Sequence, residues 1–441
     1  MVSPTYSPLR RKPRRHGALA LSPLPVMAAL FVVLGLLCGG ISQAPVLIVF
    51  VLTACYSLFT LRGLPLETRL DCFARGAGSP SLLLMVWIFI LAGAFAATAK
   101  ATGAADAAVC LTLAVLPPKM LLAGIFTASC IVSFSVGTSI GTIVAIVPVA
   151  AGLAAPSGIP VATLTAAAVG GAFFGDNLSF ISDTTIVATR TQGCLLSDKF
   201  RANVRIVLPA AIFTLAIYLF MGRGPAVLTD IPDIEATMFV KVIPYLLVVM
   251  LAMAGMNVLA VLLLANVATG LIGLLTGAFD GATWMSEATQ GIGDMGELII
   301  VSMLAGGILE TVRLSGGITY LIHRLTRRVR TTRGAELTIA ALVSLTNLCT
   351  ANNTVAILSV GRISNDIAER YGVDKRRSAS ILDTFSCAVQ GLIPYGAQLL
   401  MAAGLAGLNP VEIIPTLYYP MLTAAVALTA IVLRLPRKYS R

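Results

Sequence analysis

The densest group of polar side chains in this 441-residue chain lies in the stretch GAFFGDNLSFISDTT, residues 171–185. Asp176 and Asp183 are seven residues apart, so in a continuous helix they would share one face. Amide and hydroxyl groups flank them, on Asn177, Ser179, Ser182, Thr184 and Thr185. Because oxygen ligands without His or Cys suit hard cations, the cluster predicts a Na+ site with Asp176 and Asp183 as ligands. The alternative is that the two aspartates only cap the ends of a broken helix.

Three further polar stretches interrupt apolar sequence, at 133–142, 346–354 and 382–398. Many of their Ser and Thr hydroxyls are expected to bond their own helix backbone, whereas the adjacent amides of Asn352 and Asn353 need partners in hydrocarbon. Asp383 either joins the ion site or pairs with Arg376 or Arg377 of the nearby basic loop. The candidate residues are Ser135, Thr138, Ser139 and Thr142; Asn347, Thr350, Asn352, Asn353 and Thr354; and Asp383, Gln390 and Gln398.

The elements that carry these groups follow from the composition. Hydrophobic residues make up 57% of the chain and charged residues 12%, and the mean hydropathy is +0.91. A soluble protein carries about a quarter of its residues as charges. Apolar runs return along the chain, each near the roughly 20 residues that cross a bilayer as helix. The sequence therefore predicts an all-α polytopic membrane protein whose surrounding partner is the lipid bilayer.

The net charge of +11 does not indicate a nucleic-acid partner. The basic residues cluster at 10–16, 323–333, 374–377 and 434–441, between or beyond apolar runs and without interleaved aromatic residues. This is the pattern of cytoplasmic segments, so we expect both termini and the Arg-containing loop at 62–75 to be cytoplasmic. The acidic loops 222–240 and 280–297 are then outside.

No catalytic or cofactor-binding motif is visible in the sequence. The eight cysteines have no CxxC spacing and only two histidines occur, so we expect no disulfide, no zinc site and no cofactor. GIGDMG at 291–296 matches a dinucleotide pattern, but no strand precedes it. Without a nucleophile beside a base, or a P-loop, an enzyme is not expected, and any transport must be driven by ion gradients.

The two halves of the chain resemble each other in hydropathy. GTIVAIV at 141–147 aligns with NTVAILS at 353–359, which places Thr142 on Thr354 at an offset of 354 − 142 = 212 residues. About five crossings per half is an odd number, so the second copy must enter the membrane from the opposite side. Such inverted-topology repeats are typical of secondary transporters, whose sites form at the midplane between broken helices.

The predicted organisation assigns each half a re-entrant helical hairpin and a discontinuous helix. We expect unwound carbonyls and the negative ends of half-helices to face the bound cation. The uniformly apolar spans at 24–61 and 241–279 are the predicted scaffold. The boundaries are a basic cytoplasmic tail, 1–23; a first repeat, 24–222, with hairpin 121–157 and broken helix 163–193; an outer acidic linker, 223–240; a second repeat, 241–434, with hairpin 335–370 and broken helix 378–406; and a second basic cytoplasmic tail, 435–441.

The stretch GDNLSFISDTT at 175–185 resembles the GD-x-x-SP-x-SDTT signature of NhaC-type Na+/H+ antiporters, a family of the ion-transporter superfamily. The resemblance extends over most of the chain, including LDTFSCAVQGLIPYGAQ at 382–398. It implies a bacterial inner-membrane protein with Asp176, Ser182, Asp183, Thr184 and Thr185 at the ion site, and by analogy a homodimer formed through the scaffold spans. Phe180 stands where the family has proline, so neighbouring Gly and polar residues must make the break.

The expected function is export of cytoplasmic Na+ in exchange for H+. A carboxylate in a dry site holds either a proton or a sodium ion near neutral pH, and this competition couples the two fluxes. The alternative is a Na+- or H+-coupled carrier of a small organic acid or amino acid. Such a carrier needs an amide-rich or cationic pocket, for which Asn352, Asn353, Gln390 and Gln398 are candidates, with Arg313 if it faces inward.

Overall fold

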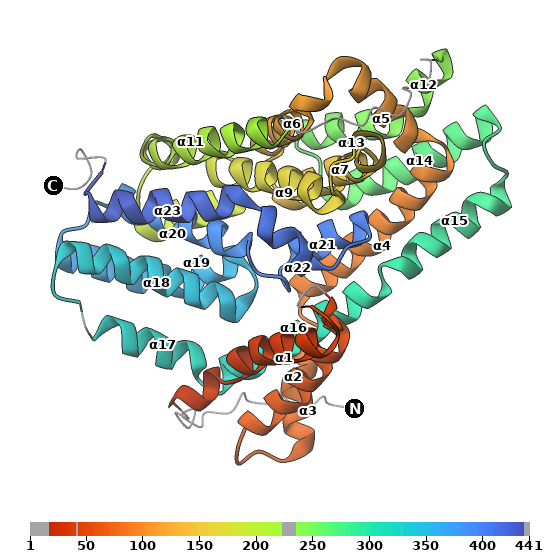
Figure 1. The fold of residues 1–441 in the computed structure, drawn as a ribbon. Coiled ribbons are helices and arrows are strands. Elements are labelled where there is room, and N and C mark those ends of the chain that lie inside the picture. The colour runs from red at the N-terminus through yellow and green to blue at the C-terminus, as the bar shows by residue number, and fades with distance from the viewer. Residues whose placement is uncertain (1–16, 41–42, 223–234, 328, 436–441) are drawn as a thin grey trace, which may run out of the picture.

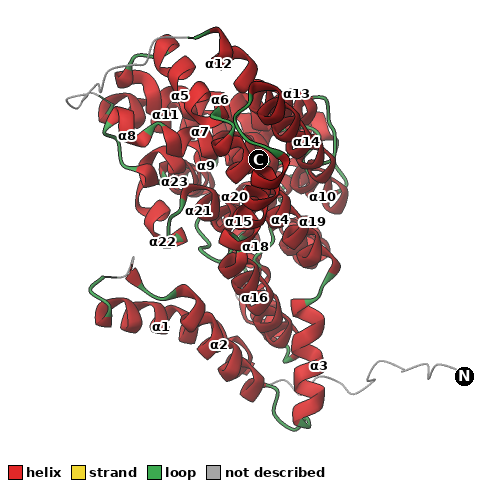
Figure 2. Cartoon of the chain, turned by 90° about the vertical axis from the view of Figure 1, so that its right-hand side faces the viewer, coloured by secondary structure: helices red, strands yellow, loops and turns green. Residues whose placement is uncertain are grey.

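The computed structural model describes residues 17–40, 43–222, 235–327 and 329–435. Within these ranges every regular element is a helix, which confirms the predicted all-α class (Figure 1). Figure 2 shows the same arrangement from the side, with α1 (Pro23–Leu37) and α2 (Val46–Thr60) lying apart from the main helical body.

The central part of the first half contains a helical hairpin and a discontinuous helix; the re-entrant course of the hairpin stays a prediction. A hairpin of α6 (Leu121–Val136) and α7 (Ser139–Gly152) turns at Gly137, whose φ of 74° favours glycine. The discontinuous helix consists of α9 (Val161–Leu178) and α10 (Asp183–Gln192). The other helices of this half are α3 (Leu66–Ala77), α4 (Pro80–Ala101), α5 (Ala104–Val115), α8 (Ala154–Ser157) and α11 (Leu196–Met221).

The second half contains the same kinds of element. Its hairpin is α18 (Thr332–Thr350) with α19 (Asn353–Tyr371), and its discontinuous helix is α20 (Lys375–Gln390) with α21 (Ala397–Ala406). The remaining helices are α12 (Ala236–Lys241), α13 (Ile243–Met253), α14 (Val258–Thr276), α15 (Gly281–Asp294), α16 (Gly296–Leu314), α17 (Gly317–Thr326), α22 (Pro410–Ile413) and α23 (Tyr418–Val432).

Two stretches predicted as loops are helices. Residues 66–77, in the predicted basic loop, form α3, because Leu66, Leu70 and Phe73 recur at helical spacing among the charges. The predicted acidic loop 280–297 is mostly α15, which packs against α4. A Cβ on Gly291 would lie 2.2 Å from the Gly93 carbonyl oxygen, so glycine at this contact lets the two helices touch. Of the acidic linker 223–240, residues 223–234 lie outside the described residues, and residues 236–240 belong to helix α12 and are not a loop.

The order of elements recurs along the chain with a slightly different offset from the predicted one. Gly137 and Ala351 end the first helix of each hairpin in the left-handed conformation, and 351 − 137 = 214. Gly193 and Gly407 end the two broken helices in the same way, and 407 − 193 = 214. At these points the predicted offset of 212 is therefore two residues too short. The inverted orientation of the second copy stays a prediction.

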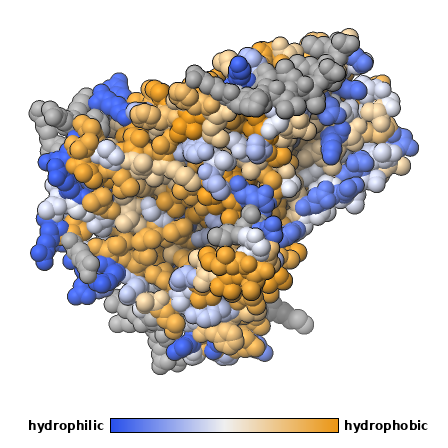
Figure 3. All heavy atoms as spheres, viewed as in Figure 1, coloured by the Kyte–Doolittle hydropathy of each residue, from blue (hydrophilic) through white to orange (hydrophobic). Residues whose placement is uncertain are grey.

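The described helices fit a polytopic membrane protein. Six are long and apolar enough to cross a bilayer, and a seventh is obtained if Ala397–Ala406 and Pro410–Thr416, bent by 97°, count as one span. α1, α2 and α23 are apolar but only 15 residues long, so about five crossings per half stays a prediction. Figure 3 shows a broad apolar surface with hydrophilic residues gathered towards the edges.

The discontinuous helices occupy the interior. α9 packs against α6 and α7, while α20 packs against α11, α18 and α19. Within residues 161–192, 83% of the most apolar 18-residue segment is buried inside the protein. By contrast, the predicted scaffold is peripheral: α1 packs against α2, α2 packs against α16, and α13 and α14 lie beside α4 to α7. The polar stretches are thus carried on the most enclosed elements.

Candidate functional site

The first helix break is made without proline, as the resemblance required. Ser179 and Ser182 bound it with extended ψ values of 141° and 135°, so the helical hydrogen-bond pattern stops between them. Phe180, at the position of the family proline, is 42% exposed and stacks on Phe200 of α11 at a centroid distance of 4.6 Å. Its side chain therefore packs on α11.

Asp176 is buried in the last turn of α9, and three elements converge on its carboxylate. Ser182 of the break donates to Oδ1 at 2.6 Å. Ser139 of the first hairpin donates to Oδ2 at 3.0 Å, and the Asn353 amide of the second hairpin donates to the same oxygen at 3.5 Å. The turns of both hairpins therefore meet at one carboxylate, which is 6% exposed.

A second ring of polar groups supports this carboxylate. The Thr184 hydroxyl lies 2.9 Å from that of Ser182 and donates to the Asp176 carbonyl at 3.4 Å. Gln398 donates to the Ser139 hydroxyl at 3.1 Å, and Gln390 donates to Gln398 at 2.9 Å. Residues from both halves of the chain thus form one continuous network. Hydroxyls within it can rotate to present oxygen to a cation.

Helix amino ends surround the Asp176 carboxylate. Ser139 is the first residue of α7 and Asn353 is the first residue of α19. These ends carry partial positive charge and so stabilise the negative carboxylate. The carboxyl end of α9, whose last turn carries Asp176, lies at the same place, and its role towards a cation stays a prediction. Sequence spacing does not reveal which end of a hairpin helix reaches the site.

The prediction of two buried aspartates is wrong for Asp183. Asp183 is the first residue of α10 and is exposed, whereas Asp176 is buried. The spacing of seven residues would align them only in a continuous helix, and the break turns the chain between them. Asp176 is therefore the carboxylate at the centre of the site.

Asp383 forms a second buried cluster with a residue that sequence reasoning missed. Its carboxylate makes an ion pair with Lys199 of α11, and both side chains are at most 1% exposed. Neither proposed arginine partner is right: Arg377 pairs with Glu336 at 3.1 Å, and Arg376 lies 3.8 Å from Asp198 and from Asp374. Both arginines are nearer than Lys199 to Asp383 in sequence. Asp383 pairs with Lys199 because α20, which carries Asp383, packs against α11.

Asn203 is the other missed residue. Its amide donates to the side-chain and backbone oxygens of Asn177, and its own oxygen accepts from Ser380 at 2.8 Å and Thr384 at 2.7 Å. Asn177 therefore bonds Asn203 of α11 and is not among the side-chain hydrogen-bond donors to the Asp176 carboxylate. Lys199 and Asn203 are four residues apart, so they share a face of α11. This spacing was the sequence feature that could have identified them as a polar pair.

Several predicted hydroxyls bond local backbone, as the alternative reading expected. Ser135 is half-buried and donates to Ile131 O at 2.9 Å, and Thr142 donates to Thr138 O at 3.2 Å. Thr350 donates to Asn352 O at 3.1 Å, and Ser179 accepts from a backbone N–H. These groups shape the turns and the break.

The remaining amides and hydroxyls of the second hairpin are mostly structural. Asn352 caps α19 by accepting from Val355 N at 3.0 Å, and Asn347 donates to Ser386 O at 2.8 Å. The Thr354 backbone N–H donates to Asn353 Oδ1 at 3.1 Å. Thr138 differs, since its buried hydroxyl has no hydrogen-bond partner in the structure. Asn353 is thus the hairpin amide that reaches the Asp176 carboxylate.

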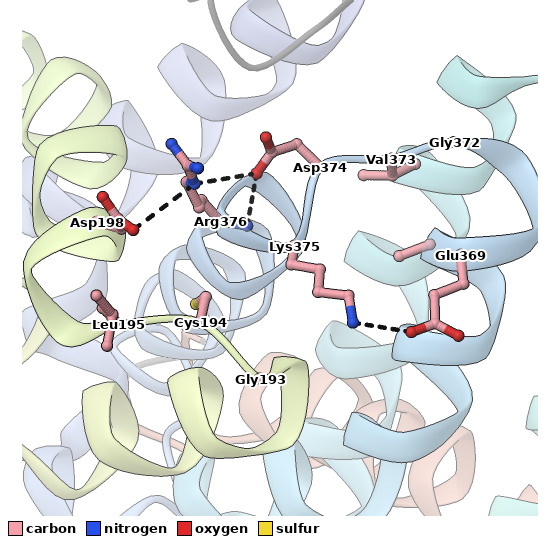
Figure 4. Close-up of a pocket in the computed structure, with 11 residues that line it drawn as sticks. Gly193, Cys194, Leu195, Asp198, Glu369, Gly372, Val373, Asp374, Lys375 and Arg376 are labelled. Atoms are coloured by element: carbon pink, nitrogen blue, oxygen red, sulfur yellow. Dashed lines mark hydrogen bonds and ion pairs between the residues drawn. The ribbon is translucent and has the colours of Figure 1, made fainter.

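Across the described ranges, no three His, Cys, Asp or Glu side chains gather as a resident metal would require. A surface cavity of about 470 Å³ lies between the α10–α11 and α19–α20 connections (Figure 4). Its charges are paired with one another: Lys375 lies 2.9 Å from Glu369, and Arg376 lies between Asp198 and Asp374. This cavity does not include Asp176 or any other predicted ion ligand.

Comparison with known proteins matches nearly the whole chain to one family. A family model described as "Na+/H+ antiporter family" covers residues 18–223 and 231–435. The Na(+)/H(+) antiporter NhaC of Alkalihalophilus pseudofirmus is 26% identical over 77% of this chain and 79% of its own length. The NhaC of Bacillus subtilis is 24% identical over 78% and 81%. A Malate-2H(+)/Na(+)-lactate antiporter of Bacillus subtilis is 21% identical over 78% and 80%.

Proposed function

The chain belongs to the Na+/H+ antiporter family, and from this premise we propose that it exports cytoplasmic Na+ in exchange for H+ at Asp176. The observation that supports this proposal is the buried Asp176 carboxylate, which accepts hydrogen bonds from both hairpins and from its own helix break. Burying such a group in a membrane costs several kcal/mol unless it is protonated, paired or cation-bound.

In the proposed mechanism the carboxylate holds one cation at a time. When Na+ replaces the proton, the Ser139 and Ser182 hydroxyls rotate so that their oxygens face the ion and their protons face other acceptors. The loaded site is neutral, and the empty site carries a buried charge that opposes movement across the membrane. Na+ and H+ therefore compete for one group. The site carries Na+ across the membrane in one direction and H+ in the other.

Alternating access follows from moving one set of elements against another. We assign the gates to the hairpin turns, because Ser139 and Asn353 both donate hydrogen bonds to the Asp176 carboxylate. The scaffold is α1, α2, α13 and α14, and we propose a homodimer through these helices. The repeats at 24–222 and 241–434 are proposed to be inverted, which would place the site at the membrane midplane.

We assign the protein to the bacterial inner membrane with both termini cytoplasmic. The start of the described chain packs against α17, which leads into the basic segment 323–333. The last described residue, Leu435, accepts a hydrogen bond from Arg377 of the basic segment 374–377. The positive-inside rule places such segments in the cytoplasm.

Reconstituted vesicles test the exchange directly. With purified protein in liposomes containing a pH-sensitive dye, Na+ added outside should drive protons out of the lumen, with no organic solute present. Because Na+ and H+ compete, the half-saturating Na+ concentration should fall as pH rises, by up to about tenfold per pH unit where protons dominate the site. If the luminal pH does not change when Na+ is added outside, the proposal is rejected.

A carrier of small organic anions remains the second candidate, for a structural reason. The amino ends of α7 and α19, with Ser139 and Asn353, suit a substrate carboxylate as well as they suit Asp176. Arg313 does not contribute, because its side chain is 62% exposed and pairs with Glu310. Accumulation of a radiolabelled dicarboxylate or amino acid on a Na+ gradient would favour this candidate.

A further inference from the structure

The ammonium group of Lys199 lies in a cage of oxygens. Nζ donates to the Asn177 carbonyl at 2.7 Å and to the Thr185 hydroxyl at 2.8 Å, and it forms the ion pair with Asp383 Oδ2. A backbone carbonyl, a hydroxyl and a carboxylate are the ligand types that hard cations such as Na+ take in proteins. The cage is therefore built for a monovalent cation, and a lysine occupies it.

The helix break explains why a carbonyl is available there. Asn177 lies in the last turn of α9, where carbonyls lose their intrahelical donors because the helix ends at Leu178. Its carbonyl instead accepts from Lys199 and from the Asn203 amide at 2.9 Å. A cation at this carboxyl end of α9 also interacts favourably with the helix dipole.

The cage stands directly beside the Asp176 site, because consecutive residues serve the two positions. Asp176 supplies the first carboxylate, and Asn177 supplies the carbonyl of the second position. Thr184 joins the Asp176 network, and Thr185 joins the Lys199 cage. The Cys387 thiol lies between them, 4.0 Å from the Thr184 hydroxyl and 3.8 Å from Asp383 Oδ1.

We propose that the break forms two adjacent positions for monovalent cations and that the Lys199 ammonium permanently fills the second. The tethered ammonium neutralises Asp383, so a free ion exchanges at Asp176 alone. The proposal rests on the proposed function only in assigning the exchanged ion to Asp176. It predicts that removing the ammonium while keeping its oxygens converts the second position into a site for free Na+.

Equilibrium binding of radioactive Na+ to purified, detergent-solubilised protein at alkaline pH tests this prediction. Lys199→Ala leaves Asp383, the Asn177 carbonyl and the Thr185 hydroxyl in place, so it should bind twice as much Na+ per chain at saturation as the unsubstituted protein. The matched double variant Lys199→Ala/Asp383→Asn also removes the carboxylate and should return to the original stoichiometry. Equal saturation in all three proteins would overturn the proposal.

The same comparison in an Asp176→Asn background separates the two hypotheses. There the lysine-containing protein should bind no Na+, and adding Lys199→Ala should restore one ion per chain. If Asp176→Asn alone still binds Na+ in full, the assignment of exchange to Asp176 fails, whereas an additional ion on adding Lys199→Ala still supports the second position. If Lys199→Ala adds no ion in either background, the second position is rejected.

Thermal stability gives an independent measurement of Na+ binding. It also shows whether each variant is folded. In the Asp176→Asn background, the melting temperature of the Lys199→Ala variant should rise when NaCl replaces choline chloride, because only Na+ fills the vacated cage. The lysine-containing protein and the Asp383→Asn double variant should not respond. Should Lys199→Ala aggregate in every salt, Lys199→Ser, whose short side chain also leaves the cage vacant, replaces it. No Na+ response from the replacement would overturn the proposal.

Discussion

At the scale of single residues, burial separates two aspartates of the same motif. Asp176 is enclosed and accepts three side-chain hydrogen bonds, whereas Asp183 is exposed at the start of α10. A carboxylate enclosed by protein without a counter-charge is unstable unless it binds a proton or a cation, and Asp183 lacks that enclosure. We therefore expect Na+ and H+ to compete at Asp176.

Asp176→Asn should abolish Na+-driven proton movement in proteoliposomes, because an amide cannot exchange a proton for Na+. The matched variant Asp183→Asn removes the same charge from an exposed position in the same motif and should keep most of the activity. Both are measured by the change in luminal pH on adding Na+. Activity that survives Asp176→Asn but is lost in Asp183→Asn would reverse the assignment.

Ser139→Ala should weaken Na+ binding, because the hydroxyl contacts both Asp176, at 3.0 Å, and Gln398, at 3.1 Å. A hydrogen bond to a charged group contributes about 1.5–3 kcal/mol, so the half-saturating Na+ concentration should rise roughly 10- to 150-fold. Ser135→Ala is the control: this serine is on the same hairpin, but it is only half-buried and bonds its own helix. Equal effects of both variants would contradict the site.

At the scale of elements, the site depends on how closely the hairpin lies on the broken helix. A Cβ on Gly175 would lie 2.2 Å from the Phe134 nitrogen, a backbone atom of α6 that cannot move aside. A Cβ on Gly137, at the hairpin turn, would lie 2.4 Å from the Ile181 side chain in the break. Glycines therefore allow the hairpin and the break to touch, and this contact brings Ser139 to Asp176.

Gly175→Ala should push α6 away from α9 and displace Asp176, the next residue. We expect a loss of about 1–3 kcal/mol of stability or more, together with loss of exchange. Gly293→Ala is the matched control, since Gly293 lies in helix α15 with nothing within 4 Å of its added Cβ. Fluorescence-detected gel filtration after heating compares the two. Full stability of Gly175→Ala would show that the α6–α9 contact is looser than described.

At the scale of the whole molecule, polar contacts connect the two halves of the chain. Lys199 and Asp383 come from different halves, as do Gln192 and Gly361, whose amide and carbonyl are 2.8 Å apart. Removing one partner of a buried ion pair typically costs about 3–5 kcal/mol, so these contacts resist separation of the halves. Any movement that opens the site must therefore carry α10, α11, α19 and α20 together or break buried contacts.

The proposed membrane orientation predicts which cysteines a membrane-impermeant maleimide labels on intact cells. In a cysteine-free background, Asp280→Cys should be labelled from outside, because it precedes the acidic helix α15 at an exposed position. Lys375→Cys, equally exposed but in the basic segment 374–377, should be labelled only after permeabilisation. Labelling of both from the same side would reject the assigned orientation.

The sequence by itself determined the all-helical membrane class and where helices are interrupted, because hydropathy and helix-breaking residues act over short stretches of chain. The re-entrant course of the hairpins stays a prediction. The sequence also identified Asp176, Ser139, Ser182 and Asn353 as polar groups that need partners within an apolar protein. The helices α3 and α15 were missed because their charges were read as signs of loops, although their remaining residues keep a helical pattern.

Only the tertiary structure decided which of these groups meet. Asp176 and Asp183 differ in burial because a four-residue break reorients the chain, and spacing alone does not give the direction of that turn. Asp383 pairs with Lys199, 184 residues away, in place of the arginines six and seven residues before it. Packing of α20 against α11 makes that choice, because an electrostatic partner is selected by distance in space and by shared exclusion from water.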